Sequence, residues 1–240
     1  MGSLNGQCEP SPNGDNCIIR DEIYYRDHVV FQVENTLFKM PRSRFQHESV
    51  YFRERFVRNS GNANEPIEGS SDEHPLVLND VTAKEFRSLL EVMFALCVHI
   101  DYLPPLNSED DWTRSNRSLL KLSTRWEMAA FRKHAIGALS EAVCPEDPSD
   151  GVRWLVFARE YVVHEWLLRS LVTLATRSQP LEMHEVEPLG LETFVALTKI
   201  REGARVNRDV KQAVLEAFGK ELKEAEAKEK RWRRLLECRE

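Results

Sequence analysis

The pattern of hydrophobic and polar positions changes between Asp27 and Phe56, from a period of two to a helical period. Apolar side chains at every second position of residues 29–33 predict a strand with one buried face. A turn is expected at Glu34-Asn35, because asparagine tolerates the left-handed backbone conformation that tight hairpins need. Leucine, phenylalanine and methionine within residues 37–40 then predict a second strand, so this segment predicts a β-hairpin.

Pro41 marks the passage from the hairpin to helical structure. Its fixed φ suits the first turn of a helix, and it has no N–H to give to a sheet ladder. The side chains that follow at helical spacing are Phe45, Ser49, Phe52 and Phe56. A hairpin that leads into a helical pair, without any catalytic motif, favours a scaffold for binding.

The rest of the chain is predicted to be helical, apart from one loop and one short strand. Residues 59–75 are rich in Asn, Ser, Gly and acids, as loops are. Residues 76–78 predict a strand that pairs with the hairpin, because a two-stranded ribbon alone is marginally stable. Thr82 and Glu85 form a capping box that begins a helix. Apolar residues spaced by three or four predict further helices over 109–126, 128–143, 148–161, 166–175, 182–187 and 191–200.

The last segment, residues 206–240, is predicted to be a charged helix. Its apolar residues recur every four positions. A stripe with this spacing drifts around a straight helix, so it gives little support to a long coiled coil. Four acid–base pairs have the favourable order and are worth a few tenths of a kcal/mol each. These pairs are Glu216–Lys220, Glu224–Lys228, Glu226–Lys230 and Glu229–Arg233. We therefore expect the distal end of this helix to persist in solvent.

One basic cluster lies in this helix and consists of Lys228, Lys230, Arg231, Arg233 and Arg234. It suits a nuclear localisation signal or a phosphate-binding patch, with Trp232 available for stacking. The segment from residue 207 onward has ten Lys/Arg and eight Asp/Glu, a net charge of only +2. That balance favours a solvated, ion-paired helix end over a role in binding nucleic acid.

Composition excludes several classes of function. The 240 residues are 42% hydrophobic with a formal net charge of −6, which gives no overall attraction to nucleic acid or anionic membranes. No apolar run is long enough to span a bilayer, and the polar N-terminus lacks a signal-peptide core. We expect an intracellular protein, cytoplasmic or nuclear. The five scattered cysteines predict neither a disulfide framework nor a zinc site.

Candidate chemistry is weak throughout the sequence. The seven histidines lack the spacing of a metal site, and no glycine-rich phosphate loop is present. Ser49 has no nucleophile-elbow motif around it, so a hydrogen bond to the local backbone is the better interpretation. The acids at 109–111 suit a helix start and not a calcium loop. We therefore predict no enzyme activity and no catalytic, cofactor-binding or metal-binding residues. The tryptophans at 112, 126, 154 and 166 are predicted to be core residues.

Three stretches of the chain together resemble the BTB/POZ domain, specifically that of fungal BTB proteins with a helical C-terminal extension. The first is Asp27 to Phe56, with its hairpin, short helix and a Ser-x-x-Phe motif at Ser49 and Phe52. The second, residues 69–90, resembles the loop, strand and helix of the same fold. The third, residues 119–139, resembles the helical pair that closes a BTB core.

The resemblance covers roughly residues 20–205 and implies an α+β, predominantly helical fold. A small sheet flanked by helices would be followed by an all-helical extension, which residues 158–161, 166–167 and 189–202 resemble. The implied organisation is a disordered tail over 1–19, a BTB/POZ domain over 20–145, a helical extension over 146–205 and the charged helix over 206–240.

The function that the resemblance implies is a non-enzymatic protein–protein interaction module, which mediates homo- or hetero-oligomerisation. Candidate contact residues are Val29, Phe31, Phe45 and Phe56, which also suit a core. The alternatives are a substrate adaptor of a cullin-type ubiquitin ligase and a transcription- or chromatin-associated BTB protein. Residues 1–17 are too rich in Gly, Pro and Asn for the N-terminal elements of the family's swapped dimers, and residues 59–75 lack the hydrophobic-x-Glu element of cullin adaptors.

Overall fold

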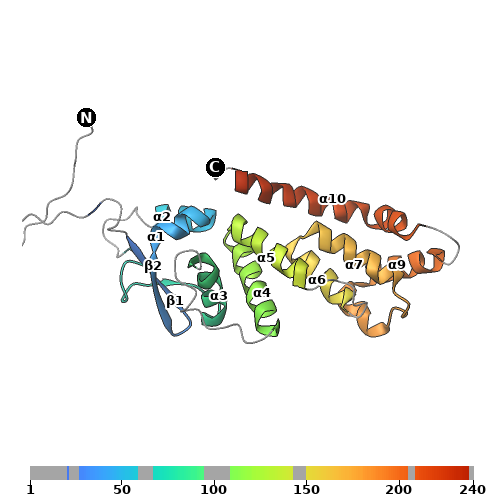
Figure 1. Ribbon diagram of the computed structural model, residues 1–240, viewed down its shortest axis with the longest axis horizontal. Coiled ribbons are helices and arrows are strands. Elements are labelled where there is room, and N and C mark those ends of the chain that lie inside the picture. The colour runs from blue at the N-terminus through green and yellow to red at the C-terminus, as the bar shows by residue number, and fades with distance from the viewer. Residues whose placement is uncertain are drawn as a thin grey trace, which may run out of the picture. The chain divides into compact units, whose positions relative to one another are not determined.

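The protein is predominantly helical and contains one small sheet, which confirms the predicted α+β class (Figure 1). The computed structural model describes residues 21, 27–58, 67–94, 109–142, 150–204 and 209–237. The chain divides into two compact units, residues 1–86 and 87–240. The predicted tail and all five cysteines lie outside the described residues.

The sheet in the first unit has three strands in the order β2-β1-β3. The predicted hairpin is confirmed as β1 (His28–Val33) paired antiparallel with β2 (Thr36–Pro41). The predicted third strand is β3 (Leu76–Val77), which pairs parallel with β1. Phe31 lies at the centre, opposite Phe38 on one side and Leu76 on the other.

The hairpin turn differs in one respect from the prediction. Glu34, and not Asn35, takes the left-handed conformation, with φ of 54°. The Glu34 carboxylate accepts a hydrogen bond of 2.9 Å from the N–H of Ala83, in the first turn of α3 (Ala83–Phe94). An acid at the positive end of a helix is stabilising, so this contact offsets the cost of the unusual backbone.

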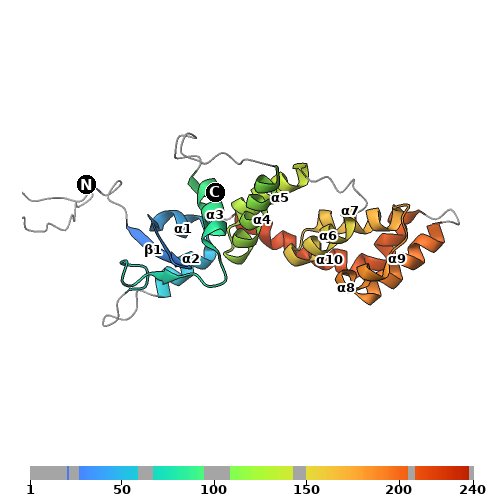
Figure 2. The ribbon, with the colours of Figure 1, turned by 90° about the horizontal axis from the view of Figure 1, so that it is seen from below.

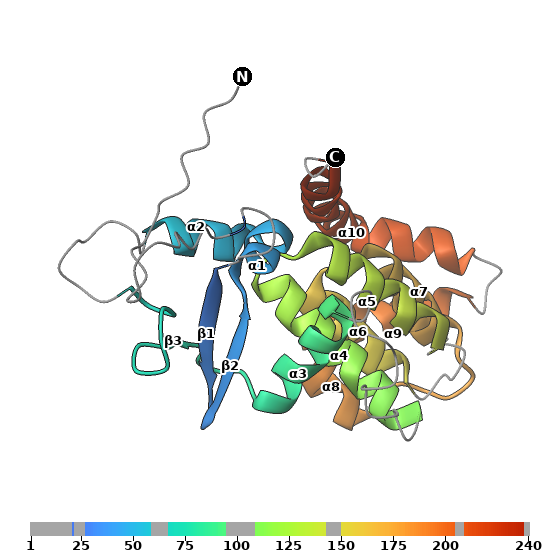
Figure 3. The same ribbon diagram turned by 60° about the vertical axis from the view of Figure 1, so that its left-hand side comes forward.

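The predicted helical pair consists of α1 (Arg42–Glu48) and α2 (Val50–Arg58), which follow the hairpin directly (Figure 3). Pro41 is the last residue of β2 and the N-cap of α1, one position before the first helical turn in which its fixed φ was expected. Ser49 interrupts the helix with an extended backbone, and its Oγ accepts a hydrogen bond of 3.0 Å from the N–H of Phe52. The prediction that Ser49 bonds the local backbone is confirmed.

Gly69 brings the loop before β3 against the sheet. Its N–H donates to His74 O at 2.7 Å, and its carbonyl accepts from Val30 N–H at 2.8 Å. Its φ is +84°, and a Cβ at this position would lie 2.7 Å from a methyl group of Val29. Glycine is therefore the residue that this close approach requires.

Phenylalanine rings form the core of the first unit. Phe31 lies within 4.7–5.5 Å, centroid to centroid, of Phe45, Phe52 and Phe86. Phe56 stacks on Phe52 at 5.8 Å. The capping box at the start of α3 is confirmed by both of its hydrogen bonds, Thr82 N–H to the Glu85 carboxylate at 2.9 Å and Glu85 N–H to Thr82 Oγ1 at 3.2 Å. The capped start of α3 thus holds Phe86 in the core.

The second unit is helical throughout its described part. Its later elements are α4 (Glu109–Arg125), α5 (Ala129–Ala142), α6 (Gly151–Tyr161), α7 (His164–Thr176), a 3₁₀ turn (Met183–Glu185), α8 (Val186–Leu189), α9 (Leu191–Ala204) and α10 (Val210–Glu237). Helices α4 and α5 pack against each other, and so do α6 and α7. Figures 1 and 2 show α10 alongside these helices, and it contacts α5, α7 and α9.

The helix predicted over residues 182–187 ends later, at Leu189, after a 3₁₀ turn and α8. The helix continues through Pro188 to Leu189, because Pro188 lies in the first turn, where its missing N–H has no intrahelical partner to lose. Gly190 ends the helix with φ of 79°. Three of the four tryptophans predicted to be core residues are buried, at positions 126, 154 and 166, and Trp112 is half-buried.

A single guanidinium joins four helices of the second unit. Arg159 on α6 donates to Glu221 on α10 at 2.7 Å and 3.2 Å, to the carbonyl of Leu189 at 2.9 Å and to Thr193 Oγ1 on α9 at 2.9 Å. The planar fork of arginine suits such directed bonds. Helices α8, α9 and α10 are therefore fixed to α6 by one side chain.

Candidate functional site

The four predicted contact residues lie in the core of the first unit. Val29, Phe31, Phe45 and Phe56 are exposed by at most 2%. The sequence allowed either a contact surface or a core for these residues, and the structure places them in the core. Their apolar periodicity identified a buried face correctly, but these side chains offer no open surface to a partner.

The basic cluster is exposed, and most of its charges have acidic neighbours. Arg231 pairs with Glu127, Lys230 with Glu226 at 3.2 Å, and Arg233 with Glu229 at 4.0 Å. The last two are among the four pairs predicted from the sequence. These contacts fit the solvated, ion-paired helix end that charge balance favoured.

Trp232 stacks within the protein, against a buried arginine. The guanidinium of Arg132 on α5 lies 4.7 Å from the centroid of the Trp232 ring and donates to the carbonyls of Tyr161 and Val162. Burial lowers the pKa of Arg132 to about 10, and the nearby charge of Glu229 opposes this shift. Glu229 also accepts a hydrogen bond of 2.8 Å from the N–H of His164, at the start of α7.

Replacing Trp232 with alanine should therefore release the last turns of α10. Loss of a partly buried cation–π contact is worth about 1–2 kcal/mol. Hydrogen exchange over residues 226–237 should become faster by a corresponding amount, while the exposed neighbour change Arg234→Ala leaves it nearly unchanged. Equal exchange in the two variants would show that Trp232 does not hold the helix.

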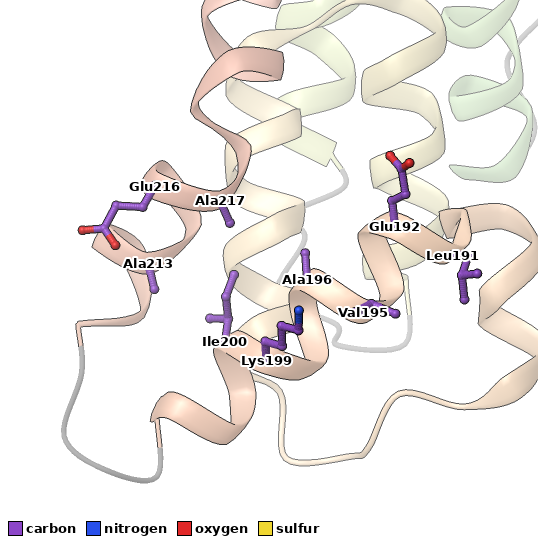
Figure 4. Close-up of a pocket in the computed structure, with 9 residues that line it drawn as sticks. All are labelled: Leu191, Glu192, Val195, Ala196, Lys199, Ile200, Ala213, Glu216 and Ala217. Atoms are coloured by element: carbon purple, nitrogen blue, oxygen red, sulfur yellow. The ribbon is translucent and has the colours of Figure 1, made fainter.

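An open hollow lies between α9 and α10, and we call it the α9–α10 groove. Its volume is about 720 Å³, and its lining residues are Leu191, Glu192, Val195, Ala196, Lys199, Ile200, Ala213, Glu216 and Ala217. Leu191 is 67% exposed and Val195 is 40% exposed. Figure 4 shows these side chains along α9, with Ala213 and Ala217 on the facing helix. Exposed apolar side chains in a groove are typical of a protein-binding surface.

The charges beside the groove are Glu192 and Lys199 on α9 and Glu216 on α10, all exposed. Gln212 donates a hydrogen bond of 3.3 Å to Glu216, whose carboxylate points away from α9 in Figure 4. Glu192 and Lys199 form no hydrogen bond or ion pair with the rest of the described chain. They lie seven residues apart, two turns along the same side of the helix.

A second pocket, of about 540 Å³, lies in the first unit beside β1. Its lining mixes Asp27, Lys39 and Glu68 with the apolar edge of the core. Arg42, which also lines it, already donates to the Phe56 carbonyl at 3.1 Å and lies 4.7 Å above the Phe56 ring. The Arg42 guanidinium of this pocket is therefore already engaged by Phe56.

The histidines and acids of the described residues are spread over many elements. Within them, no three His, Cys, Asp or Glu side chains gather as a metal site. The described histidines are exposed or half-buried, and His184 pairs with Glu182 at 3.2 Å. Among the described helices, none has both the length and the apolar composition needed to cross a bilayer.

Comparison of the sequence with models of known protein families and with curated proteins found no match.

The sequence predicted α9 but not the groove beside it. Leu191 and Val195 are four residues apart, as in any helix with an apolar stripe. A usable signal was present in the small residues Ala196, Ala213 and Ala217, since short side chains leave room between neighbouring helices.

Proposed function

We propose that this protein is a non-enzymatic protein–protein interaction module, which binds its partner through the α9–α10 groove. The observation that carries the proposal is the open apolar lining, with Leu191 67% exposed, Val195 40% exposed and alanines on the facing helix. Grooves of this kind accept an amphipathic helix, whose apolar face replaces water along the floor. Binding would then remove the exposed leucine and valine from solvent.

The proposed module is of the BTB/POZ type. Support comes from the order of elements in the first unit: the β1–β2 hairpin, the α1–α2 pair broken at Ser49, and β3 added parallel to β1. The helices from α6 to α9 would be the proposed extension. We propose the partner surface on these later helices, because the four candidate contact residues of the hairpin and first helices are buried.

The test is a double substitution in the groove, Leu191→Ser with Val195→Ser. The matched control is Leu215→Ser with Val57→Ser, which removes side chains that are 39% and 69% exposed outside the groove. The tagged full chain and both variants are compared by affinity capture with mass spectrometry and by sedimentation velocity. We expect a protein partner, a second copy included, to be retained by wild type and control and lost from the groove variant.

Circular dichroism would show that both variants are folded. Identical partners and identical sedimentation for all three proteins would overturn the proposed function. The cullin-adaptor and chromatin-associated alternatives stay predictions. A cullin that the wild type captures and the groove variant loses would favour the first of them.

A further inference from the structure

We propose that the α9–α10 groove binds a second copy of this chain, with the two α9 helices antiparallel about a twofold axis. This inference rests on the proposed function and names its partner. The supporting observation is the pattern of charged and apolar residues along α9. When a second α9 lies antiparallel to the first, opposite charges face each other and apolar residues face apolar residues.

The charges of α9 set the register. Glu192 and Lys199 are exposed, lie on one side of the helix, and have no ion-pair partner in the described part of the chain. If two copies of α9 run antiparallel with the axis between Val195 and Ala196, Glu192 lies opposite the partner's Lys199. Symmetry then places Lys199 opposite the partner's Glu192, so one register forms two ion pairs.

The same register matches apolar with apolar. Val195 lies opposite the partner's Ala196, and Leu191 lies opposite the partner's Ile200. A twofold interface needs this property, because each contact between two different positions occurs twice. Leu191 and Val195, which are 67% and 40% exposed in the single chain, would become buried, Val195 beside the axis and Leu191 at each end of the contact.

The second wall of the groove fits a helix from the partner. Ala213 and Ala217 on α10 face α9 with short side chains, and Figure 4 shows Glu216 pointing away from the groove. Helices approach to 8–10 Å where the side chains between them are small. Each α9 would therefore lie between the partner's α9 and the partner's α10, at the centre of a four-helix contact.

Charge reversal tests the register directly. Glu192→Lys alone and Lys199→Glu alone each place like charges opposite each other twice, so we expect each to weaken self-association about tenfold or more. An equimolar mixture of these two variants should associate again, because every lysine then meets a glutamate. The double variant, which carries both changes, should also associate. Sedimentation equilibrium of the full chain at several concentrations measures all four.

The matched controls are Glu224→Lys and Lys223→Glu, exposed positions on α10 that do not line the groove. They make the same changes in net charge, and we expect them to associate as the wild type does. Recovery in the mixture also shows that the single variants are folded.

Three results would overturn the twofold contact: a wild type that stays monomeric, single variants that associate as the wild type does, or a mixture that stays dissociated. A monomeric wild type that captures another protein, and loses it on Leu191→Ser with Val195→Ser, would overturn only the second copy as partner. Absence of any groove-dependent partner would overturn the proposed function as well.

Discussion

Replacing Phe31 with alanine is expected to lower the free energy of unfolding of the first unit by about 3–5 kcal/mol, the range for a buried phenylalanine. Phe31 has no exposed surface, and its ring contacts those of Phe45, Phe52 and Phe86. Removing it leaves a cavity that three rings from three different elements must close. Hydrogen exchange of β1, α1 and α2, with urea denaturation of the full chain, measures the loss.

The matched control is Tyr51→Ala, which removes an aromatic side chain from α2 that is 37% exposed. Its cost should stay below about 1.5 kcal/mol, because less apolar surface returns to water. If the two variants unfold at the same urea concentration, the phenylalanine cluster is not the centre of the first unit.

Replacing Glu185 with alanine is expected to cost the second unit about 3–5 kcal/mol, as breaking a buried ion pair does. The side chains of Glu185 and Arg177 are 8% and 5% exposed, and they pair with each other. The carboxylate also accepts a hydrogen bond of 2.8 Å from Glu182 N–H. Without it, the guanidinium of Arg177 stays buried without a counter-charge. Denaturation of the full chain, followed by hydrogen exchange of α7 and α8, measures the effect.

The control for this substitution is Glu165→Ala, which breaks the exposed pair with Arg169 at 2.6 Å. An exposed pair contributes at most about 1 kcal/mol. Comparable losses from the two substitutions would contradict the assigned role of the buried pair.

Glu185 should also make stability depend on pH. Burial alone raises the pKa of the Glu185 carboxyl, but hydrogen bonds from Arg177 and Glu182 and the charge of Arg177 together lower it below 4.5. Its contribution is therefore complete above pH 4.5 and lost as the pH falls through the lowered pKa. The stability difference between wild type and Glu185→Gln should accordingly shrink in acid. A difference that stays constant from pH 7 to pH 3 would contradict this.

Local signals predicted the first unit well, because its elements are specified by neighbouring residues. The alternation in residues 29–33, the break at Pro41 and the capping box at Thr82 each act within a few positions, and each appears where predicted. The turn conformation was missed because the group that stabilises Glu34 belongs to Ala83, far along the chain.

The candidate site could be predicted only in part. Periodicity marks which side of a helix or strand is apolar, but it does not say what covers that side. Phe31 and Leu191 are both apolar residues in regular elements, yet the first is fully buried and the second is 67% exposed. The difference comes from packing: rings from α1, α2 and α3 cover Phe31, while the neighbours of α9 on its open side are alanines of α10.

The domain organisation could also be predicted only in part from the sequence. The boundary that the resemblance implies between residues 145 and 146 stays a prediction. The division into compact units falls at Phe86 instead, because α5 contacts α10 and α4 contacts α6 across the predicted boundary. Long-range packing decides which elements belong together, and local sequence signals do not show it.

The fork of Arg159 restricts which sequences can maintain the α9–α10 groove. Arg159 does not line the groove, but it bonds Thr193 on one wall and Glu221 on the other. Lysine would keep the charge at this position and lose the fixed geometry of the bonds, so the spacing of the walls would no longer be set. In related chains that bind the same partner, arginine at this position should therefore be retained even where the groove residues themselves vary.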